Sequence, residues 1–571
     1  MRRFIAALLI GACCSLPSSP LLADNKDGPT TPAAPTAPAT PTAPAEPTAT
    51  PPEASPPAPA PADPKALPEK LPRTKLPPAK VMPNLSVYHY RVSTDSPECQ
   101  TFVDQGLAFF YSYMWMEAAR NFETAIHFDP QCAIAWWCLS RAQDQWTFNG
   151  ADALKKANEL AAHASYPEQQ LIKARMQERG LLPDVGDQEA RKKAAIATLD
   201  YLLALHDDDQ EAWFARAQLA NGGNFFGGSA ASVAFYKALL RLNTLHPGAN
   251  HELVHYYELA GRPNLGWANS ENYIRSSPGV PHSWHMQAHL ATRLGRWNRA
   301  TASSLRGCEV QRAYQKTMNV TPRQDYQFEH HLEILMMCLI HDGRFREARA
   351  LRAECEGYGF KHHATWFRLA LAERDYDAAL ALAELQRRRD KIGAAHMAAL
   401  VYLARHEPAR AEAEVEVLEE ALREQKQRNR TLELRVWETR GWLLVQTDGV
   451  DAGLALLKKA VDATKDDYSH HAWGNGAYYM ETWGIAALSA GRLEIAEEAF
   501  LEALAHDSGS VRGAMGMQIL CERQDRQAEA RHFGQLARRY WKNAEVARFD
   551  AEFLALQRVM PGTAVTARSD D

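Results

Sequence analysis

The sequence lacks an excess of charge of either sign. Its 571 residues contain 64 Lys and Arg and 69 Asp and Glu, which gives a net charge of −5, and the two signs are interspersed along the chain. Proteins that bind nucleic acid or anionic membrane surfaces usually gather Lys and Arg into a basic patch. Because no such patch stands out, we expect no nucleic-acid partner and no membrane surface held by basic residues.

The sequence also lacks the short motifs of several common chemistries. It has no GxxxxGK(S/T) phosphate loop, no GxSxG nucleophile elbow, no GxGxxG turn after a strand and no CxxC pair. Seven cysteines follow the first 23 residues, an odd number, and most occupy apolar positions of expected helices. We therefore expect buried thiols with at most one disulfide, and neither a thiolate zinc site nor a redox motif.

The first apolar run, Phe4–Ala12, is too short to span a membrane and follows two arginines, which is the layout of a secretory signal peptide. Residues 1–23 are therefore predicted to direct export. Two forms stay open. Cleavage after Leu21–Ala23 would release a periplasmic protein, whereas Ile10–Cys13 resembles a lipoprotein box, in which a lipid on Cys13 would be the only link to the membrane.

Residues 24–85 are predicted to be a disordered linker. Most of them are Pro, Ala, Thr or Glu, a composition with too little apolar surface to offset the entropy lost on folding. In polyproline II geometry some 50 residues reach about 150 Å, at about 3.1 Å per residue. That reach would hold a folded domain well clear of a membrane or wall, which fits a tethered exported protein.

Internal periodicity organises the remaining residues, which are too many for one compact core. A 34-residue window that opens at Cys99 carries small and bulky residues at positions 8, 20, 24, 27 and 32, namely Gly106, Ala118, Phe122, Ala125 and Pro130. Similar spacing recurs at Gly484, Ala496 and Phe500. These segments resemble the tetratricopeptide-repeat (TPR) family.

The resemblance implies helical hairpins that stack side by side. Small residues at positions 8 and 20 let the two helices of a hairpin approach closely, and the large residue at position 24 fills the groove between hairpins. One hairpin cannot bury this surface alone, so several must stack. We predict an all-α protein in which residues 86–545 form an α-solenoid of roughly nine to twelve hairpins. A tail at residues 546–571 would follow.

Histidines are concentrated in the segment 246–363, which holds eleven of the 21 in the chain. Three expected helices there each carry two ligand-type residues one turn apart: His251 and His255, His285 and His289, and His330 and Glu333. Residues three or four apart lie on the same face of an α-helix. In TPR proteins these helix positions face the concave groove, so the resemblance implies that the three pairs line one inner surface.

This pattern predicts a metal site on the inner surface. Neutral imidazole binds zinc, copper or iron, and an added carboxylate is compatible with zinc or iron. Six ligands suffice for two such ions, so the hypothesis is a divalent transition-metal cofactor. The alternative is that the histidines line a groove for a protein or peptide partner, or are half-buried residues satisfied by hydrogen bonds.

One motif suggests catalysis. His251-Glu252-Leu253-Val254-His255 matches HExxH, in which two histidines hold zinc and the glutamate activates the bound water. Peptidases of that class set this helix beneath a strand, and no strand is expected here. We therefore favour the interpretation of Glu252 as a charged surface residue over that of a catalytic base, and we assign no catalytic residue. Glu258 and Glu271 are further candidate ligands.

Three segments resemble those of a set of bacterial exported TPR proteins with a histidine-rich central segment. They are Pro247–His255, His285–Trp297 and Tyr326–Arg344. This chain has Glu333 where the third segment of those proteins usually has a second histidine. The resemblance implies the fold and the site but no established activity. Two functions therefore stay open: an extracytoplasmic binding scaffold with a metal site, and a metal-dependent enzyme, hydrolytic through Glu252 or oxidative with iron or copper.

Overall fold

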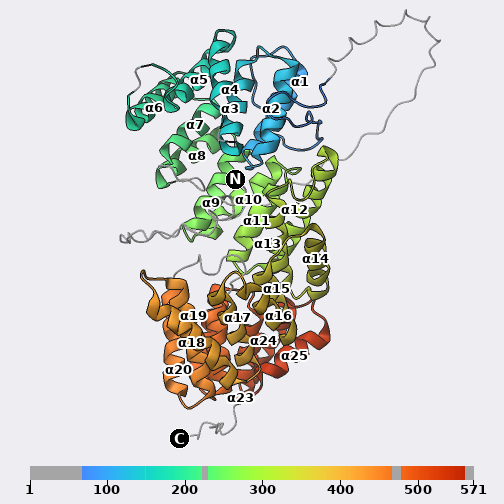
Figure 1. Ribbon diagram of the computed structural model, residues 1–571, viewed down its shortest axis with the longest axis vertical. Coiled ribbons are helices and arrows are strands. Elements are labelled where there is room, and N and C mark those ends of the chain that lie inside the picture. The colour runs from blue at the N-terminus through green and yellow to red at the C-terminus, as the bar shows by residue number, and fades with distance from the viewer. Residues whose placement is uncertain (1–66, 148, 184–185, 222–228, 466–476, 560–571) are drawn as a thin grey trace, which may run out of the picture. The chain divides into compact units, whose positions relative to one another are not determined.

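The computed structural model describes residues 67–147, 149–183, 186–221, 229–465 and 477–559, all of which belong to one compact unit, Lys65–Asp571. The predicted signal peptide at residues 1–23 lies outside the described residues, as does most of the predicted linker. Within the described ranges every regular element is a helix (Figure 1), so the predicted all-α fold is confirmed. None of these helices combines the length and apolarity needed to cross a membrane.

Consecutive helices of the described ranges pair into twelve hairpins. The first six are α1 (Pro97–Phe110) with α2 (Trp115–Phe128), α3 (Ala133–Trp146) with α4 (Ala151–Glu159), α5 (Tyr166–Glu178) with α6 (Gln188–Leu205), α7 (Gln210–Ala220) with α8 (Ala230–Leu242), α9 (Pro247–Leu259) with α10 (Trp267–Ser276), and α11 (Pro281–Arg293) with α12 (Trp297–Met318). The next six are α13 (Phe328–His341) with α14 (Phe345–Tyr358), α15 (His363–Ala372) with α16 (Tyr376–Arg387), α17 (Lys391–Ala404) with α18 (Pro408–Glu424), α19 (Arg430–Gln446) with α20 (Val450–Thr464), α21 (Tyr478–Ser489) with α22 (Leu493–His506), and α23 (Val511–Arg523) with α24 (Gln527–Tyr540). Two short 3-10 helices, η1 (Ala161–His163) and η2 (Pro263–Gly266), lie between helices, and α25 (Val546–Leu556) follows the last hairpin.

The hairpins close where the sequence places its smallest residues. A Cβ atom added to Gly106 on α1 would lie 2.4 Å from the ring of Phe122 on α2, and one added to Gly484 on α21 would lie 2.6 Å from the ring of Phe500 on α22. Both contacts are shorter than van der Waals distance, so only glycine lets these helices pack so closely. The small-and-bulky spacing of the TPR pattern is thus confirmed as the packing of the hairpins.

The folded region begins earlier than predicted. Within the last part of the predicted linker 24–85, Leu71 is fully buried. The backbone amides of Arg73 and Thr74 donate to the carboxylate of Glu123 at 2.5 and 2.7 Å. Polar side chains of α2 therefore satisfy the backbone of a segment whose composition indicates disorder. The predicted boundary between linker and solenoid is wrong for this reason.

The predicted tail 546–571 begins with helix α25, which also packs onto the solenoid. Phe549 and Leu556 are buried, and Phe553, between them, is partly buried. Their spacing of four and three residues places them on one face of a helix. The first part of the tail is therefore folded, which corrects the prediction.

The seven cysteines of the described region are buried free thiols, as expected: Cys99, Cys132, Cys138, Cys308, Cys338, Cys355 and Cys521. Most lie on the packed faces of helices and act there as small apolar residues. They contribute to the core of the hairpins.

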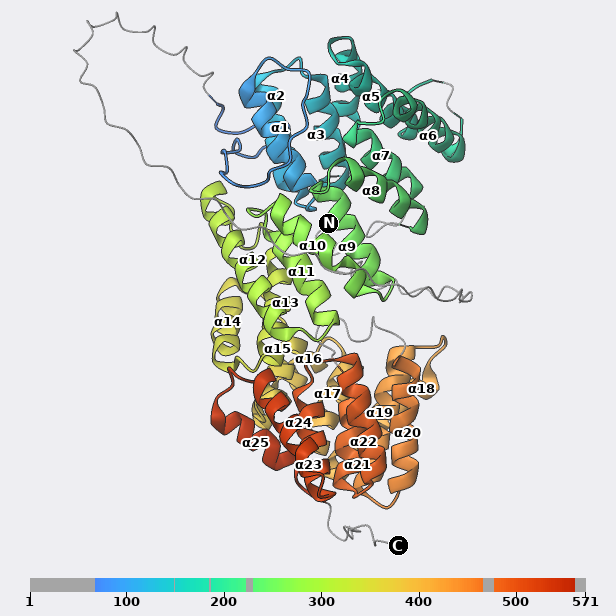
Figure 2. The ribbon, with the colours of Figure 1, turned by 180° about the vertical axis from the view of Figure 1, so that it is seen from behind.

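Helices near the C-terminus contact the middle of the chain: Arg548 of α25 donates to the carbonyl of Glu373, just after α15, at 2.5 Å. Figure 1 and Figure 2 show α24 and α25 in the same half of this unit as α15, α16 and α17. Trp297 at the start of α12 donates from its indole to both carboxylate oxygens of Asp507, at 2.9 and 3.1 Å. The hydroxyl of Ser508 donates to the carbonyl of Leu294 at 2.8 Å. The turn between α11 and α12 is therefore joined to the turn between α22 and α23.

This junction predicts a dependence of stability on pH. Burial raises the pKa of Asp507 to about 7, although the Gly509 amide and the Trp297 indole donate to its carboxylate. Below about pH 4, the pKa of aspartate in the unfolded chain, Asp507 is protonated in both states and its stabilising contribution is complete. As the pH rises through about 7, the unfolded chain has already lost this proton and the folded protein loses it as well, so the contribution disappears. Relative to Asp507→Asn, we expect the parent to lose about 2 kcal/mol of unfolding free energy between about pH 5.5 and about pH 7.5.

Urea unfolding of both proteins at the two pH values measures this difference. Asp550→Asn, a change at an exposed aspartate on α25, is the matched control and should leave the pH dependence of the parent intact. A constant difference between the parent and Asp507→Asn across this range would contradict the assignment.

Candidate metal centre

The first helices of three consecutive hairpins, α9, α11 and α13, lie in a row in the middle of the chain, where α11 contacts both α9 and α13. Pro247 and Pro281 stand in the first turns of α9 and α11, where the missing amide hydrogen costs nothing and the fixed backbone angle favours helix initiation. His246 caps α9, because its Nδ1 accepts the amide hydrogen of Ala249 at 3.2 Å. These starts set which residues of each helix face the neighbouring helix.

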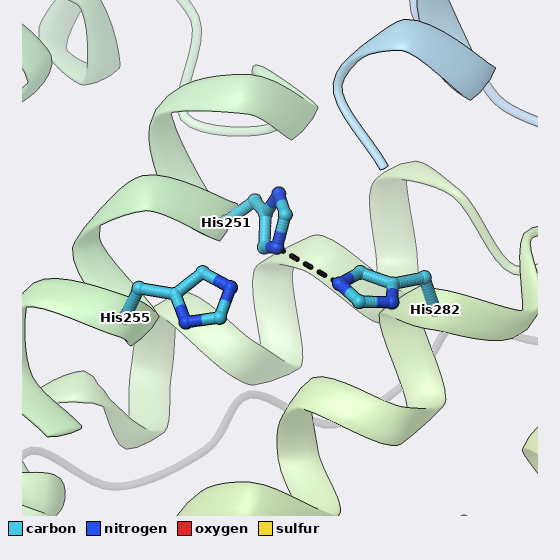
Figure 3. A group of neighbouring side chains, drawn as sticks. All are labelled: His251, His255 and His282. Atoms are coloured by element: carbon cyan, nitrogen blue, oxygen red, sulfur yellow. Dashed lines mark hydrogen bonds between the residues drawn. The ribbon is translucent and has the colours of Figure 1, made fainter. Parts of the chain in front are cut away.

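Seven histidines from these helices gather in one cluster: His251 and His255 on α9, His282, His285 and His289 on α11, and His330 and His331 on α13. Neighbouring rings lie with centroids 4.0 to 6.5 Å apart. Figure 3 shows the rings of His251, His255 and His282 turned toward one another. The Nε2 atoms of His251 and His282 are 3.0 Å apart, and those of His285 and His289 are 2.8 Å apart.

The cluster contains three overlapping groups of three histidines, and within each group one ring nitrogen per residue lies within 4.8 Å of the others. The groups are His251, His255 and His282; His282, His285 and His331; and His285, His289 and His330. The first and third groups, which we call the α9 triad and the α13 triad, share no residue. Five of the six predicted ligands therefore belong to these two triads.

The sixth predicted ligand, Glu333, lies elsewhere. Its carboxylate accepts a hydrogen bond from Thr365 at 3.0 Å and is 3.6 Å from Nδ1 of His362. Successive residues of a helix point about 100° apart, and α13 turns the side with His331 toward α11, where the ring of His331 stacks on His285 at 4.0 Å. Glu333 consequently faces α15, and it belongs to none of the three histidine groups.

Two members of the cluster, His282 and His331, were missed by a search for pairs on single helices. A signal for His282 is present in the sequence, because His282, His285 and His289 form a stripe with spacings of three and four. His331 is the second residue of a histidine doublet. Nothing local distinguishes its inward position from an outward one.

The cluster is buried rather than open to a groove. His251 is fully buried, and His285 and His289 are 2% and 6% exposed. The turn between α1 and α2, residues 111–114, lies over one end of the cluster, where the ring of Tyr113 contacts His251, His255 and His282. The hydroxyl of Tyr273 donates to Ser112 of this turn at 2.6 Å, and the ring of Tyr113 stacks on His255. The expectation of an open inner surface at these residues is thus corrected.

Hydrogen bonds around the cluster set which nitrogen carries hydrogen. Nδ1 of His251 lies 2.6 Å from the carbonyl oxygen of Tyr111, which only accepts, so Nδ1 is the protonated nitrogen. Nδ1 of His289 donates to the Glu258 carboxylate at 3.0 and 3.1 Å. In both rings the lone pair is on Nε2, which points into the cluster. This is the arrangement in which an outer hydrogen bond orients a metal-binding histidine.

The electrostatics favour neutral rings. Burial, and next the neighbouring histidines, lower the pKa of His251, His282 and His285 well below the usual value, and burial lowers the pKa of His330 to about 4. Neutral imidazole is the form that binds metal ions. Among the described residues, Nε2 of His331 is a buried polar atom with no hydrogen-bond partner, which is uncommon in folded proteins.

Glu258 anchors one side of the cluster from α9. Besides His289 it accepts from Arg293 at 3.1 Å, and all three side chains are at most 6% exposed. Burial alone would raise the pKa of Glu258, but His289 and Arg293 hold it well below the usual value. Glu258 therefore acts on the cluster as a charged hydrogen-bond acceptor that orients His289.

The other acidic candidates have different roles. Glu252, within HExxH, is buried and accepts a hydrogen bond from the Tyr113 hydroxyl at 2.8 Å. Glu271 accepts from the Trp267 indole at 3.0 Å at an exposed position. Neither belongs to a histidine triad. A donor set of imidazole nitrogens alone fits zinc or copper, and three protein ligands leave a fourth position open on each ion.

Removing Glu258 should destabilise the middle hairpins. Glu258→Ala takes the buried carboxylate away from Arg293 and His289, and breaking such a pair costs about 3 kcal/mol. Urea unfolding followed by circular dichroism measures the loss, and the exposed Glu309→Ala on α12 is the control, with a change within about 0.5 kcal/mol. Combining Glu258→Ala with Arg293→Leu should restore part of the stability. If Glu258→Ala unfolds like the control, the buried pair does not stabilise the fold.

Comparisons with known proteins found no family and only distant structural neighbours. No family model matches the chain, and no curated protein matches its sequence. The human IFIT1 dimer with PPP-AAAA is 12% identical, with 76% of this chain and 89% of that chain covered at a TM-score of 0.27. The APC/C hetero-tetramer Cut9-Hcn1 is 11% identical (77% and 79%, TM-score 0.30), and the TPR domain of P58(IPK) is 10% identical (78% and 99%, TM-score 0.25). The TPR-type architecture rests on the hairpins and the glycine packing of this chain itself.

Proposed function

We propose that this protein is a helical-repeat scaffold whose buried histidine cluster binds two divalent transition-metal ions. The observation that carries the proposal is that the α9 triad and the α13 triad share no residue, so both can be occupied together. The middle group competes with both, because it needs His282 from one triad and His285 from the other. His331 is then a neighbour of the two ions and a ligand of neither.

The donor set narrows the choice of metal. Of the predicted ions, zinc and copper bind sites made only of imidazole, whereas protein sites for iron commonly add a carboxylate. The one predicted carboxylate ligand, Glu333, points to Thr365 and His362. We therefore favour zinc or copper over iron.

A scaffold role is favoured over a zinc hydrolase. A catalytic glutamate in HExxH must reach the water on the metal. Here the Tyr113 hydroxyl donates to Glu252, and the turn that carries Tyr113 covers the α9 triad. Metal binding at such a buried position joins three hairpins and contributes folding energy, as structural sites do. The exposed parts of the repeat array would serve a protein or peptide partner.

Metal content tests the proposal. The full chain, purified without histidine tags or chelators, is expected to hold two ions per chain by mass spectrometry. His255→Ala removes a ligand of the α9 triad and His330→Ala one of the α13 triad, so each variant should keep one ion. His331→Ala should keep both, as should His363→Ala, a control at a histidine outside the cluster.

Other outcomes contradict distinct parts of the proposal. A single ion that is lost in His331→Ala and kept in His255→Ala would assign the middle group and refute the two-ion arrangement. A folded parent without metal, even after incubation with zinc or copper, would refute the metal site altogether. Helical content by circular dichroism separates these outcomes from misfolding.

Export is part of the same proposal and rests on the layout of residues 1–23. The full chain expressed in a bacterial host should leave the cytoplasm, and deletion of residues 1–23 should retain it there, as cell fractionation would show. Cys13→Ser distinguishes the two forms of export, because it releases only a lipid-anchored protein from the membrane fraction. Full-length protein found in the cytoplasm would contradict export.

A further inference from the structure

A second site lies in the C-terminal half, in a cleft of about 100 Å³ lined by residues of α15, α19, α21, α23 and α25. We propose that this cleft binds a small organic anion, a molecule with an apolar body and a carboxylate or phosphate group. None of its lining residues belongs to the histidine cluster. The proposal is therefore independent of metal binding.

Positive charge exceeds negative charge in the lining. Four arginines, Arg368, Arg374, Arg512 and Arg558, stand against three glutamates, Glu438, Glu481 and Glu552. Glu552 of α25 is buried and binds two of the arginines, Arg374 at 3.0 Å and Arg512 at 2.6 Å. This carboxylate holds both guanidinium groups at the wall of the cleft and is fully occupied by them.

The other two carboxylates are also engaged. Glu438 is buried and accepts hydrogen bonds from Nε2 of His396 and the hydroxyl of Thr482, both at 2.9 Å. Glu481 accepts from the hydroxyl of Ser510 at 2.7 Å and lies 3.6 Å from Arg512. The hydrogen bonds of these acidic groups are thus satisfied within the protein. Burial alone would raise the pKa of Glu438, but His396, and next the charge of Arg368, lower it. The four arginines keep an excess of one positive charge over the three glutamates.

Arg368 provides N–H groups that an anion could bind. Its guanidinium lies 4.2 Å from the ring centroid of Tyr478, a cation–π contact, and it makes no hydrogen bond or ion pair with the residues described. The Tyr478 ring is itself held, because its hydroxyl lies 3.0 Å from Nε2 of His341. Stacking on an aromatic face leaves the N–H groups of arginine available for two parallel bonds to a carboxylate or phosphate.

The surroundings agree with a positive potential. Burial, and next the charges of Arg558 and Arg374, lower the pKa of His406 at one end of the cleft. The lining also includes Tyr376, Trp442 and several aliphatic side chains, so an apolar body is accommodated beside the charge. An anionic head at Arg368 with an apolar body toward Trp442 fits this combination.

Isothermal titration of the full chain with benzoate and with phenyl phosphate tests the inference. We expect at least one of the two to bind with a dissociation constant at or below about 1 mM, and the stronger of them identifies the preferred head group. Arg368→Gln should weaken binding about tenfold or more, and Arg368→Lys less, because lysine keeps the charge but loses the paired donors. Arg388→Gln, at an exposed arginine outside the cleft, is the matched control.

Three results would overturn the inference. One is the absence of heat from both anions up to about 10 mM with folded protein. Another is equal binding by the parent and by Arg368→Gln. The third is equal binding of benzyl alcohol, which has the apolar body without the charge. If Arg368→Gln fails to fold, Arg558→Gln, at an exposed residue of the cleft, replaces it in the same comparison.

Discussion

The packing of seven imidazole rings between three helices, five of them buried, is the constraint on which the middle of this protein depends. A polar ring removed from water costs free energy unless each nitrogen finds a partner. The protein satisfies outer nitrogens with the Tyr111 carbonyl and the Glu258 carboxylate. Inner nitrogens then face one another at 2.8 and 3.0 Å, where one member of each pair must donate. The metal ion that we propose for each triad would accept several lone pairs at once and would relieve these rings of the need to share hydrogens between facing nitrogens.

Closure by the first hairpin makes that burial possible. The turn 111–114 belongs to α1 and α2 but contacts α9, α10 and the start of α13, through residues that are 139 to 215 positions apart in the sequence. Tyr113 adopts a positive φ of 57°, which turns the chain sharply enough to place its ring over His251 and His255. The hydroxyl of the same tyrosine donates a hydrogen bond to the carboxylate of Glu252. One turn thus covers the α9 triad and engages Glu252 in a hydrogen bond.

The sequence predicted what depends on neighbouring residues and missed what depends on distant ones. Gly106 and Phe122 define a hairpin because they are sixteen residues apart within one repeat, and their contact follows from that spacing. Five members of the histidine cluster were predicted because one-turn spacing fixes a helix face. The choice of His331 over Glu333 depends instead on the direction in which α13 meets α11. The spacing of residues within α13 does not encode that direction. The contact of residues 111–114 with the cluster likewise joins residues that are far apart in the sequence.

The segments that the sequence placed outside the solenoid pack against helices of its repeats. Residues 71–85, predicted as linker, and α25, predicted as tail, do not follow the repeat pattern, so a search for the pattern passes over them. Yet Glu552 of α25 fixes Arg374 and Arg512 at the cleft, and Leu85 lies against Gly279 before α11, where an added Cβ would meet the Leu85 backbone at 2.7 Å. A repeat array supplies rows of parallel helices whose inner faces resemble one another. Non-repeating segments make one part of such a row different from the next, and in this chain they contact it before α11 and at the cleft.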